Sequence, residues 1–285
     1  MRSMEKVILV PTDFSPNAVK AAQYALKLSE TMVCKVYLLH AYMAFHSAFQ
    51  SELANRTDEQ RAEAGAQKGM SGFLEALGLD KDSPQISTGI VKADLTDAVE
   101  RFIAENKNVL IIMGTHGASG VKMGLLGSNT YDVAKVASVP ILIMPLNAVD
   151  IKPEKVTFFT DYQEADNETL KWLVTLFGDL IWKCTLVHIH EESTPPTEED
   201  RQKLEAWKER LGSMASPVQL DSELVHGRES IALVDEILGR HNASLTVLTL
   251  VGGRSFFEKL MHKSLAKAII HQPKTPVLLL RDEIR

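Results

Sequence analysis

The chain has 285 residues and a net charge of −6, and 45% of its residues are hydrophobic against 24% charged. This balance is typical of a globular protein with room for two domains, and the acidic charge excludes nucleic acid binding by bulk attraction. The apolar runs are shorter than a membrane span, and the one that ends at Pro11 is too short for a signal peptide. We therefore expect a cytoplasmic protein with neither a membrane nor a nucleic acid partner.

Short apolar runs alternate with helical patterns along the first half of the chain. Strands are expected at 6–11, 35–41, 86–91, 109–113 and 140–144, and helices at 17–33, 57–77, 95–105 and within 114–137. Ser15 and Pro16 give the first helix a cap and a first-turn proline. Continuously apolar strands separated by helices indicate a parallel sheet covered on both faces. The predicted fold class is therefore α/β, a doubly wound and Rossmann-like five-stranded sheet.

The second half of the chain repeats the first. Asp13, at the end of the first strand, recurs as Asp161 after 148 positions, and the histidine that ends the second strand recurs after the same interval as His188. The fourth and fifth strands recur after 136 positions, so the second copy is shorter in its middle. We expect two tandem domains, 1–147 and 152–285, joined by a short polar link.

A glycine-rich loop follows the fourth strand. Gly114 and Gly117 come first, and nine residues separate Gly117 from Gly127. Ser128 and Asn129 then begin a helical pattern. Glycines let the backbone approach a ligand closely, and the free N–H groups at a helix start attract phosphate oxygens. Because ligands of open α/β sheets bind at the carboxyl ends of strands, this pattern predicts a phosphate-binding loop. The alternative is that the glycines only close a surface loop.

Asp13 lies at the carboxyl end of the first strand, within reach of the same crevice if the first and fourth strands are neighbours. A carboxylate there accepts hydrogen bonds from ribose hydroxyls or helps to hold a Mg²⁺ ion that bridges phosphates. The structural alternative is an N-cap of the first helix, a role for which Ser15 competes.

Residues 1–147 resemble the universal stress protein family, whose ATP-binding members carry the motif G-x2-G-x9-G-(S/T). The match rests on the glycine loop together with Pro11-Thr12-Asp13-Phe14-Ser15, Leu39-His40-Ala41 and Met113-Gly114-Thr115-His116-Gly117. One departure precedes the third helix, where the family often has Gly-x-Pro and this chain has Gly89-Ile90-Val91.

The resemblance implies a HUP-type fold, similar to the adenine nucleotide alpha hydrolases, with ATP, AMP or another adenine nucleotide as ligand. The implied adenine pocket is formed by Pro11, Thr12, Asp13, Ala41, Met113 and Gly114. The phosphates would lie on Gly117, Gly127, Ser128 and Asn129. Mg²⁺ would be held in part by Asp13.

The second copy departs from the loop motif. Leu250 stands opposite Gly114, and Lys263 stands opposite Gly127. Gly253 keeps the place of Gly117, and Ser264 keeps that of Ser128. Lys263 would project a side chain where a phosphate should meet backbone, so we expect no nucleotide there. An anion held by the lysine is the alternative.

Two further features of the second copy have structural interpretations. Asp161 is expected to cap the helix that starts near Ala165. His188 and His190 alternate along a strand, as metal ligands sometimes do. The match of His188 to His40 favours a structural role instead.

The resemblance implies a stress-response protein that binds ATP in its first domain and acts as a nucleotide-dependent sensor or regulator. No general base is evident, so we expect at most weak ATP hydrolysis. One alternative is a nucleotide-free interaction scaffold, against which the intact first loop argues. The other is an ATP-using enzyme, which needs a Ser-Gly-Gly-x-Asp-Ser or His-x-Gly-His motif absent from this sequence.

Members of this family pair edge to edge through their fifth strands. The resemblance therefore implies that 141–144 and 277–280 form an intramolecular pseudo-dimer, with a homodimer as the alternative. Pairing would also cover two edge strands that otherwise favour aggregation.

Overall fold

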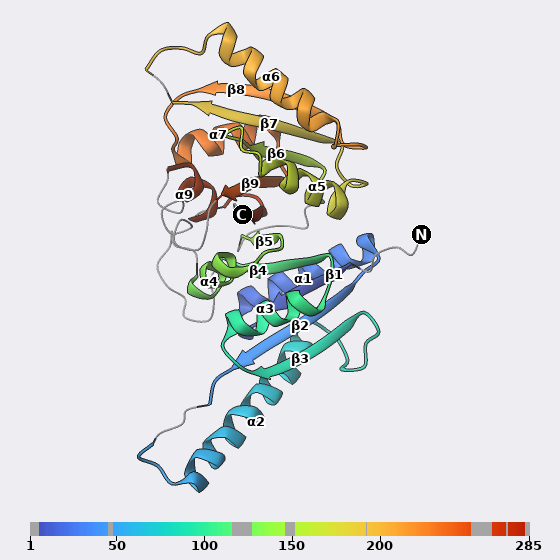
Figure 1. Ribbon diagram of the computed structural model, residues 1–285. Coiled ribbons are helices and arrows are strands. Elements are labelled where there is room, and N and C mark those ends of the chain that lie inside the picture. The colour runs from blue at the N-terminus through green and yellow to red at the C-terminus, as the bar shows by residue number, and fades with distance from the viewer. Residues whose placement is uncertain are drawn as a thin grey trace. The chain divides into compact units, whose positions relative to one another are not determined.

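The computed structural model describes residues 6–44, 48–115, 127–145, 152–191, 193–251, 264–271 and 273–282 (Figure 1). The chain forms two compact units, the first made of Met1–Val121 and Gly127–Ala137, the second of Lys122–Leu126 and Ser138–Arg285. Every helix in the described ranges is too short or too polar to cross a membrane.

The first unit is built on a parallel sheet in the order β3-β2-β1-β4. Its elements are β1 (Val7–Pro11), α1 (Pro16–Met32), β2 (Lys35–Tyr42), α2 (Glu52–Ala76), β3 (Ile86–Lys92), α3 (Leu95–Glu105), β4 (Val109–Gly114) and α4 (Ser128–Val136). β1 lies between β2 and β4, which confirms the expected adjacency of the first and fourth strands. Nearly all residues of β1 and β4 are buried, as strands covered on both faces require.

Local signals set the ends of the helices. Ser15 caps α1 by accepting a hydrogen bond from the Ala18 N–H at 3.2 Å, and Pro16 occupies the first turn, as predicted. α2 begins five residues before its predicted start, because Ser51 caps it through the Ala54 N–H at 3.2 Å. The early part of α2 is exposed and polar, so it carries no hydrophobic period from which its start could be predicted.

The second unit contains a sheet in the order β5-β10-β9-β6-β7-β8. Its elements are β5 (Ile141–Met144), β6 (Lys155–Phe159), α5 (Asp166–Phe177), β7 (Lys183–His190), α6 (Glu198–Gly212), β8 (Leu220–His226), α7 (Ile231–His241), β9 (Leu245–Val251), α9 (Ser264–His271) and β10 (Val277–Asp282). The strands from β6 to β10 pair in parallel, which confirms the α/β class.

β5 belongs to the first repeat in sequence, yet it lies in the second compact unit. It pairs antiparallel with β10, and Ile143 stands opposite Val277. All four residues of β5 are buried. The predicted pseudo-dimer of whole domains and the predicted homodimer stay predictions, as do the predicted domain boundaries.

Glycines in α2 allow a paired test of packing. A Cβ atom at Gly65 would meet nothing within 4 Å, whereas one at Gly69 would lie 2.3 Å from the Phe14 ring. Gly65→Ala should raise the free energy of unfolding by about 1 kcal/mol, because alanine is the better helix former. Gly69→Ala should lower it, because the Phe14 ring must move. Urea unfolding of both variants measures the difference, and an equal gain in stability would contradict the packing described here.

Candidate functional site

A cavity of about 230 Å³ lies at the carboxyl ends of β1, β2 and β4 in the first unit, and we call it the strand-end cavity. Seven of the predicted site residues line it, namely Pro11, Thr12, Asp13, Ala41, Met113, Gly114 and Asn129. Gly127 and Ser128 are not among its lining residues and form the N-cap and first residue of α4. Gly117 lies outside the described residues.

A tight turn after β1 places Asp13 at this cavity. Phe14 has a φ of 64°, and its N–H donates to the Thr12 hydroxyl at 3.0 Å. The Nδ1 atom of His40 lies 2.8 Å from the Thr12 carbonyl oxygen, so Nδ1 carries the proton and donates. The Phe14 ring stacks on His40 with a centroid distance of 4.2 Å. These contacts hold a non-glycine residue in the left-handed region and fix the backbone of Asp13.

Asp13 does not cap the first helix, since Ser15 is the N-cap residue of α1. Its Oδ1 atom accepts a hydrogen bond from the Ser15 N–H at 3.1 Å, within the turn itself. The carboxylate is half-buried and lines the cavity.

The two ends of the glycine loop are joined at its base. The Gly127 N–H donates to the Thr115 carbonyl at 2.7 Å, and the Thr130 hydroxyl donates to the Gly114 carbonyl at 2.8 Å. These bonds bring the start of α4 to the end of β4. Gly127 makes no side-chain cap bond, so the first-turn N–H groups of α4 are not capped by their N-cap residue.

Gly114 is needed for a close approach between β4 and α1. A Cβ atom at this position would lie 3.2 Å from both the Cβ and the carbonyl oxygen of Asn17. The glycine therefore keeps the strand end near the first turn of α1, beside the cavity.

Sequence analysis did not identify the second carboxylate of the cavity, Asp94. It is the N-cap of α3, and its Oδ1 atom accepts from the Thr96 N–H at 2.9 Å and from the Thr96 hydroxyl at 2.6 Å. The hydroxyl bond, followed by the backbone bond, lowers the pKa of Asp94. Its position just after β3, at the same edge as Asp13, was the available signal.

The other lining residues that sequence analysis did not identify are Ser15, Ala18, His40, Met43, Ala93, Leu95 and Thr130. The described residues that line the strand-end cavity include no lysine or arginine. The charged side chains among them are the carboxylates Asp13 and Asp94.

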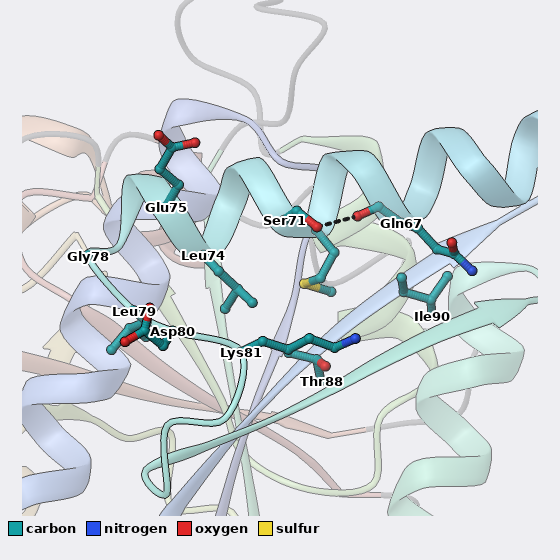
Figure 2. Close-up of a pocket in the computed structure, with 11 residues that line it drawn as sticks. Gln67, Ser71, Leu74, Glu75, Gly78, Leu79, Asp80, Lys81, Thr88 and Ile90 are labelled. Carbon is teal, nitrogen blue, oxygen red and sulfur yellow. Dashed lines mark hydrogen bonds between the residues drawn. The ribbon is translucent and has the colours of Figure 1, made fainter.

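A larger cavity of about 810 Å³ lies elsewhere in the first unit, against the later part of α2, the segment that follows it and β3. Figure 2 shows Gln67 and Ser71 on α2 facing Thr88 and Ile90 of β3 across it. None of the predicted site residues lines this cavity. Its lining lacks the glycine loop and the strand ends, so we assign it no part in the predicted chemistry.

The second unit retains the turn of the first in detail. Tyr162 has a φ of 59°, and its N–H donates to the Thr160 hydroxyl at 3.0 Å. His188 Nδ1 lies 2.9 Å from the Thr160 carbonyl, and the Tyr162 and His188 rings have a centroid distance of 4.4 Å. His188 thus has the structural role expected from its match to His40. No cluster of three or more metal-ligating side chains occurs in the described ranges.

The predicted role of Asp161 as a helix cap is wrong. α5 starts at Asp166, and its N-cap residue, Ala165, makes no side-chain cap bond. The helix starts where it was predicted, but residues 164 and 165 form a turn before it, and Asp161 does not reach the first N–H groups of the helix as a cap. The Asp161 carboxylate instead lies 3.5 Å from His188 Nδ1.

Asp166 is a buried carboxyl beside the retained turn, and only 1% of the residue is exposed. The Thr160 hydroxyl donates to its Oδ2 atom at 2.5 Å. Burial raises its pKa to about 6, while hydrogen bonds from Thr160, Thr249 and the Gln163 backbone oppose the rise. Of the degenerate loop, Leu250 is buried and Gly253 and Lys263 lie outside the described residues.

The Asp166 carboxyl should make the stability of the second unit depend on pH. Its pKa is about 6 in the fold against an ordinary value of 3.8, so the folded state holds a proton that the unfolded state releases. The contribution to the free energy of unfolding is therefore largest below pH 4. It falls by on the order of 3 kcal/mol as the pH rises through 6.

Denaturant unfolding of the wild type and Asp166→Asn between pH 4 and pH 8 measures this contribution. The neutral amide should flatten the fall in stability. Asp179→Asn, at an exposed aspartate of the same unit, is the matched control and should keep the wild-type profile. Identical profiles for Asp166→Asn and the wild type would contradict the buried, titrating carboxyl.

Comparison with known proteins places the chain in a family. The model of the universal stress protein family matches residues 4–145. Universal stress protein MJ0531 of Methanocaldococcus jannaschii is 27% identical over 143 residues, which cover 50% of this chain and 83% of that protein. Universal stress protein MJ0577 of the same organism is 29% identical over 165 residues, which cover 50% of this chain and 97% of that protein.

A solved structure extends the likeness in fold to the second repeat. A universal stress protein from Archaeoglobus fulgidus is 18% identical, and its alignment covers 98% of this chain and 97% of its own, with a TM-score of 0.67. The glycine-loop motif, the two-unit fold and the family match agree, and the chain belongs to the universal stress protein family.

Proposed function

We propose that the first repeat, 1–147, binds ATP or another adenine nucleotide such as AMP in the strand-end cavity. The observation that carries this proposal is the convergence of seven predicted residues from β1, β2, β4 and α4 on one cavity at the carboxyl ends of the strands. Ligands of open α/β sheets bind at that edge. Occupancy of the cavity would be the signal of a cytoplasmic stress-response protein.

Different residues at the cavity match the adenine, the ribose and the phosphates of a nucleotide. Pro11, Ala41 and Met113 offer apolar surface to an adenine ring. Asp13 and Asp94 are acceptors for ribose hydroxyls. The first-turn N–H groups of α4, where Ser128 and Asn129 lie, would receive phosphate oxygens together with the glycine loop.

The charge balance of the cavity favours a metal-bound nucleotide. Among its described lining residues are two carboxylates and no lysine or arginine, so free ATP would meet repulsion from that part of the lining. A Mg²⁺ ion is commonly held by one or two carboxylates and by the phosphates of the nucleotide. In this proposal Asp13 is the carboxylate that holds it.

The second repeat, 152–285, takes no nucleotide in this proposal, so one ATP binds per chain. Pairing of repeats through the fifth strand, within one chain or between two, completes the proposed assembly. We propose a regulator rather than an enzyme, with at most slow hydrolysis of the bound ATP.

Isothermal titration of ATP, AMP and cyclic AMP tests the binding site. Gly127→Lys should abolish saturable binding, because the lysine side chain would enter the space of the phosphates. Gly127 has a φ of −58°, which lysine adopts without strain, so the effect does not arise from the backbone. Gly72→Lys, an exposed position on α2, is the matched control and should bind like the wild type. No saturable heat from the wild type with any nucleotide would refute the proposal.

Titration with and without Mg²⁺ tests the role of Asp13. We expect ATP affinity to fall at least ten-fold when Mg²⁺ is removed, and Asp13→Asn to weaken Mg-ATP binding by a similar factor, about 1.4 kcal/mol. Asp97→Asn removes an exposed carboxylate of α3 outside the cavity and should leave the affinity unchanged. Equal affinities for wild type and Asp13→Asn would argue against Asp13 as the metal-binding carboxylate.

A further inference from the structure

The retained turn allows the two units to be compared residue by residue. Thr12, Phe14 and His40 in the first unit have the same mutual contacts as Thr160, Tyr162 and His188 in the second. The interval of 148 residues therefore holds from β1 through β2 and across the helix between them. The interval of 136 residues applies to β4 and β9.

Three residues that line the strand-end cavity are replaced in the second unit. The lining residues Ala18, Met113 and Gly114 have the counterparts Asp166, Thr249 and Leu250. Each replacement adds a hydrogen-bonding group or bulk at a position that borders open space in the first unit.

The replacements form one buried network. Asp166 accepts a hydrogen bond from Thr160 and lies beside Thr249, whose hydroxyl donates to the Thr169 hydroxyl at 2.9 Å. Thr160 and Thr169 are buried, and Leu250 is only 3% exposed. The Asp166 carboxyl group is therefore hydrogen-bonded within the protein, as a buried polar group requires.

Leu250 adds bulk at the third position. It is buried in the second unit, whereas its counterpart Gly114 borders the strand-end cavity in the first.

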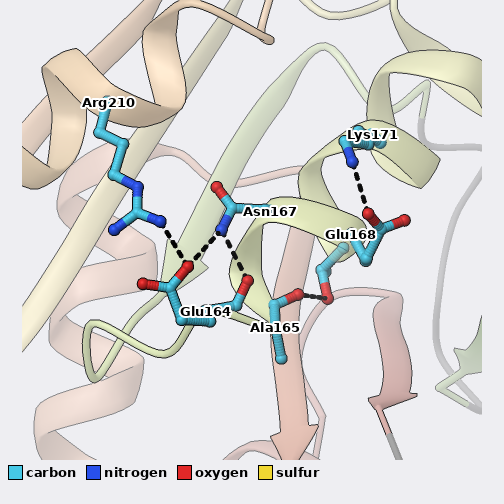
Figure 3. Close-up of polar contacts among 7 residues, drawn as sticks. Glu164, Ala165, Asn167, Glu168, Lys171 and Arg210 are labelled. Atoms are coloured by element: carbon cyan, nitrogen blue, oxygen red, sulfur yellow. Dashed lines mark hydrogen bonds and ion pairs between the residues drawn. The ribbon is translucent and has the colours of Figure 1, made fainter.

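Surface contacts hold the start of α5 and hence Asp166. Figure 3 shows Arg210 of α6 paired with Glu164, whose backbone carbonyl accepts from the Asn167 side chain at 2.7 Å. The Thr169 hydroxyl also donates to the Ala165 carbonyl at 3.3 Å. The residues on both sides of Asp166 are thereby fixed.

We infer that Asp166 is the residue that excludes a nucleotide from the second unit, because its buried carboxyl fills the place that Ala18 leaves open in the first. A carboxylate at this place both occupies the space and repels an anionic ligand. This inference rests on the proposed function, since it explains why the first unit alone binds the nucleotide. It assigns the selectivity to the first residue of α5 and not to the degenerate loop.

The inference is tested by moving the carboxyl into the first unit. Ala18 is three residues after the N-cap Ser15, where an acidic side chain favours a helix, so Ala18→Asp should fold. In calorimetric titration with Mg-ATP, we expect Ala18→Asp to bind at least ten-fold more weakly than the wild type. Pro16→Asp places the same charge on the exposed first position of α1, outside the cavity, and should stay within about three-fold of the wild type.

The outcomes separate the inference from the proposed function. Unchanged affinity in Ala18→Asp beside a binding wild type overturns the inference alone. A wild-type stoichiometry of two ATP per chain overturns the inference and the proposal that the second repeat takes no nucleotide, but leaves nucleotide binding by the first repeat standing. A wild type that binds no nucleotide overturns the proposed function and the inference with it. A thermal melt checks the fold of each variant. If Ala18→Asp does not fold, Ala18→Asn fills the same space without charge and should also lose at least ten-fold.

Discussion

The turn after the first strand of each repeat depends on a hydrogen bond from a histidine on the neighbouring strand. His40 donates to the Thr12 carbonyl, and His188 donates to that of Thr160. The register of β1 with β2, in which Pro11 stands opposite Leu39, brings each histidine to this place. The bond holds the following aromatic residue at a positive φ and fixes the aspartate before it. The strand-end cavity of the first unit is built around this turn, and the closed network of the second unit starts from it.

The same turn supports two different ways of completing a unit. In the first, small residues around it leave a cavity bordered by two carboxylates. In the second, Asp166 replaces a small residue and accepts a hydrogen bond from Thr160, and Thr249 donates to Thr169. An open cavity and a buried carboxyl both cost folding free energy, the first through lost packing and the second through desolvation. A bound ligand can offset the cost of the open cavity. The cost of the buried carboxyl is offset by hydrogen bonds within the chain.

Sequence reasoning succeeded where the signal was local. Apolar runs gave the strands, and Ser15 with Pro16 gave the start of α1. Of the seven cavity residues predicted, Asp13, Gly114 and Asn129 follow from the strand ends and the glycine loop. The family resemblance supplied the other four, Pro11, Thr12, Ala41 and Met113. The position of Ala18 at the cavity was not predicted, because a small residue on a buried helix face does not indicate that a cavity lies beside it. The start of α5 was predicted to within one residue, but its cap was not, because the N-cap residue Ala165 has no capping side chain. The apolar run of β5 predicted burial, and the family resemblance implied pairing with 277–280, but neither predicted that β5 belongs to the second compact unit.

The placement of β5 separates the boundary of the repeat from the boundary of the packed unit. A fragment cut at the repeat boundary, 152–285, would lack the strand that pairs with β10. The edge of β10, with buried Val277, Leu278 and Leu279, would then be uncovered, and uncovered apolar edges favour association between molecules. A fragment that starts at Ser138 would keep the strand. The segment that is repeated in sequence is therefore not the segment that packs as a unit. The two differ by one short strand, β5.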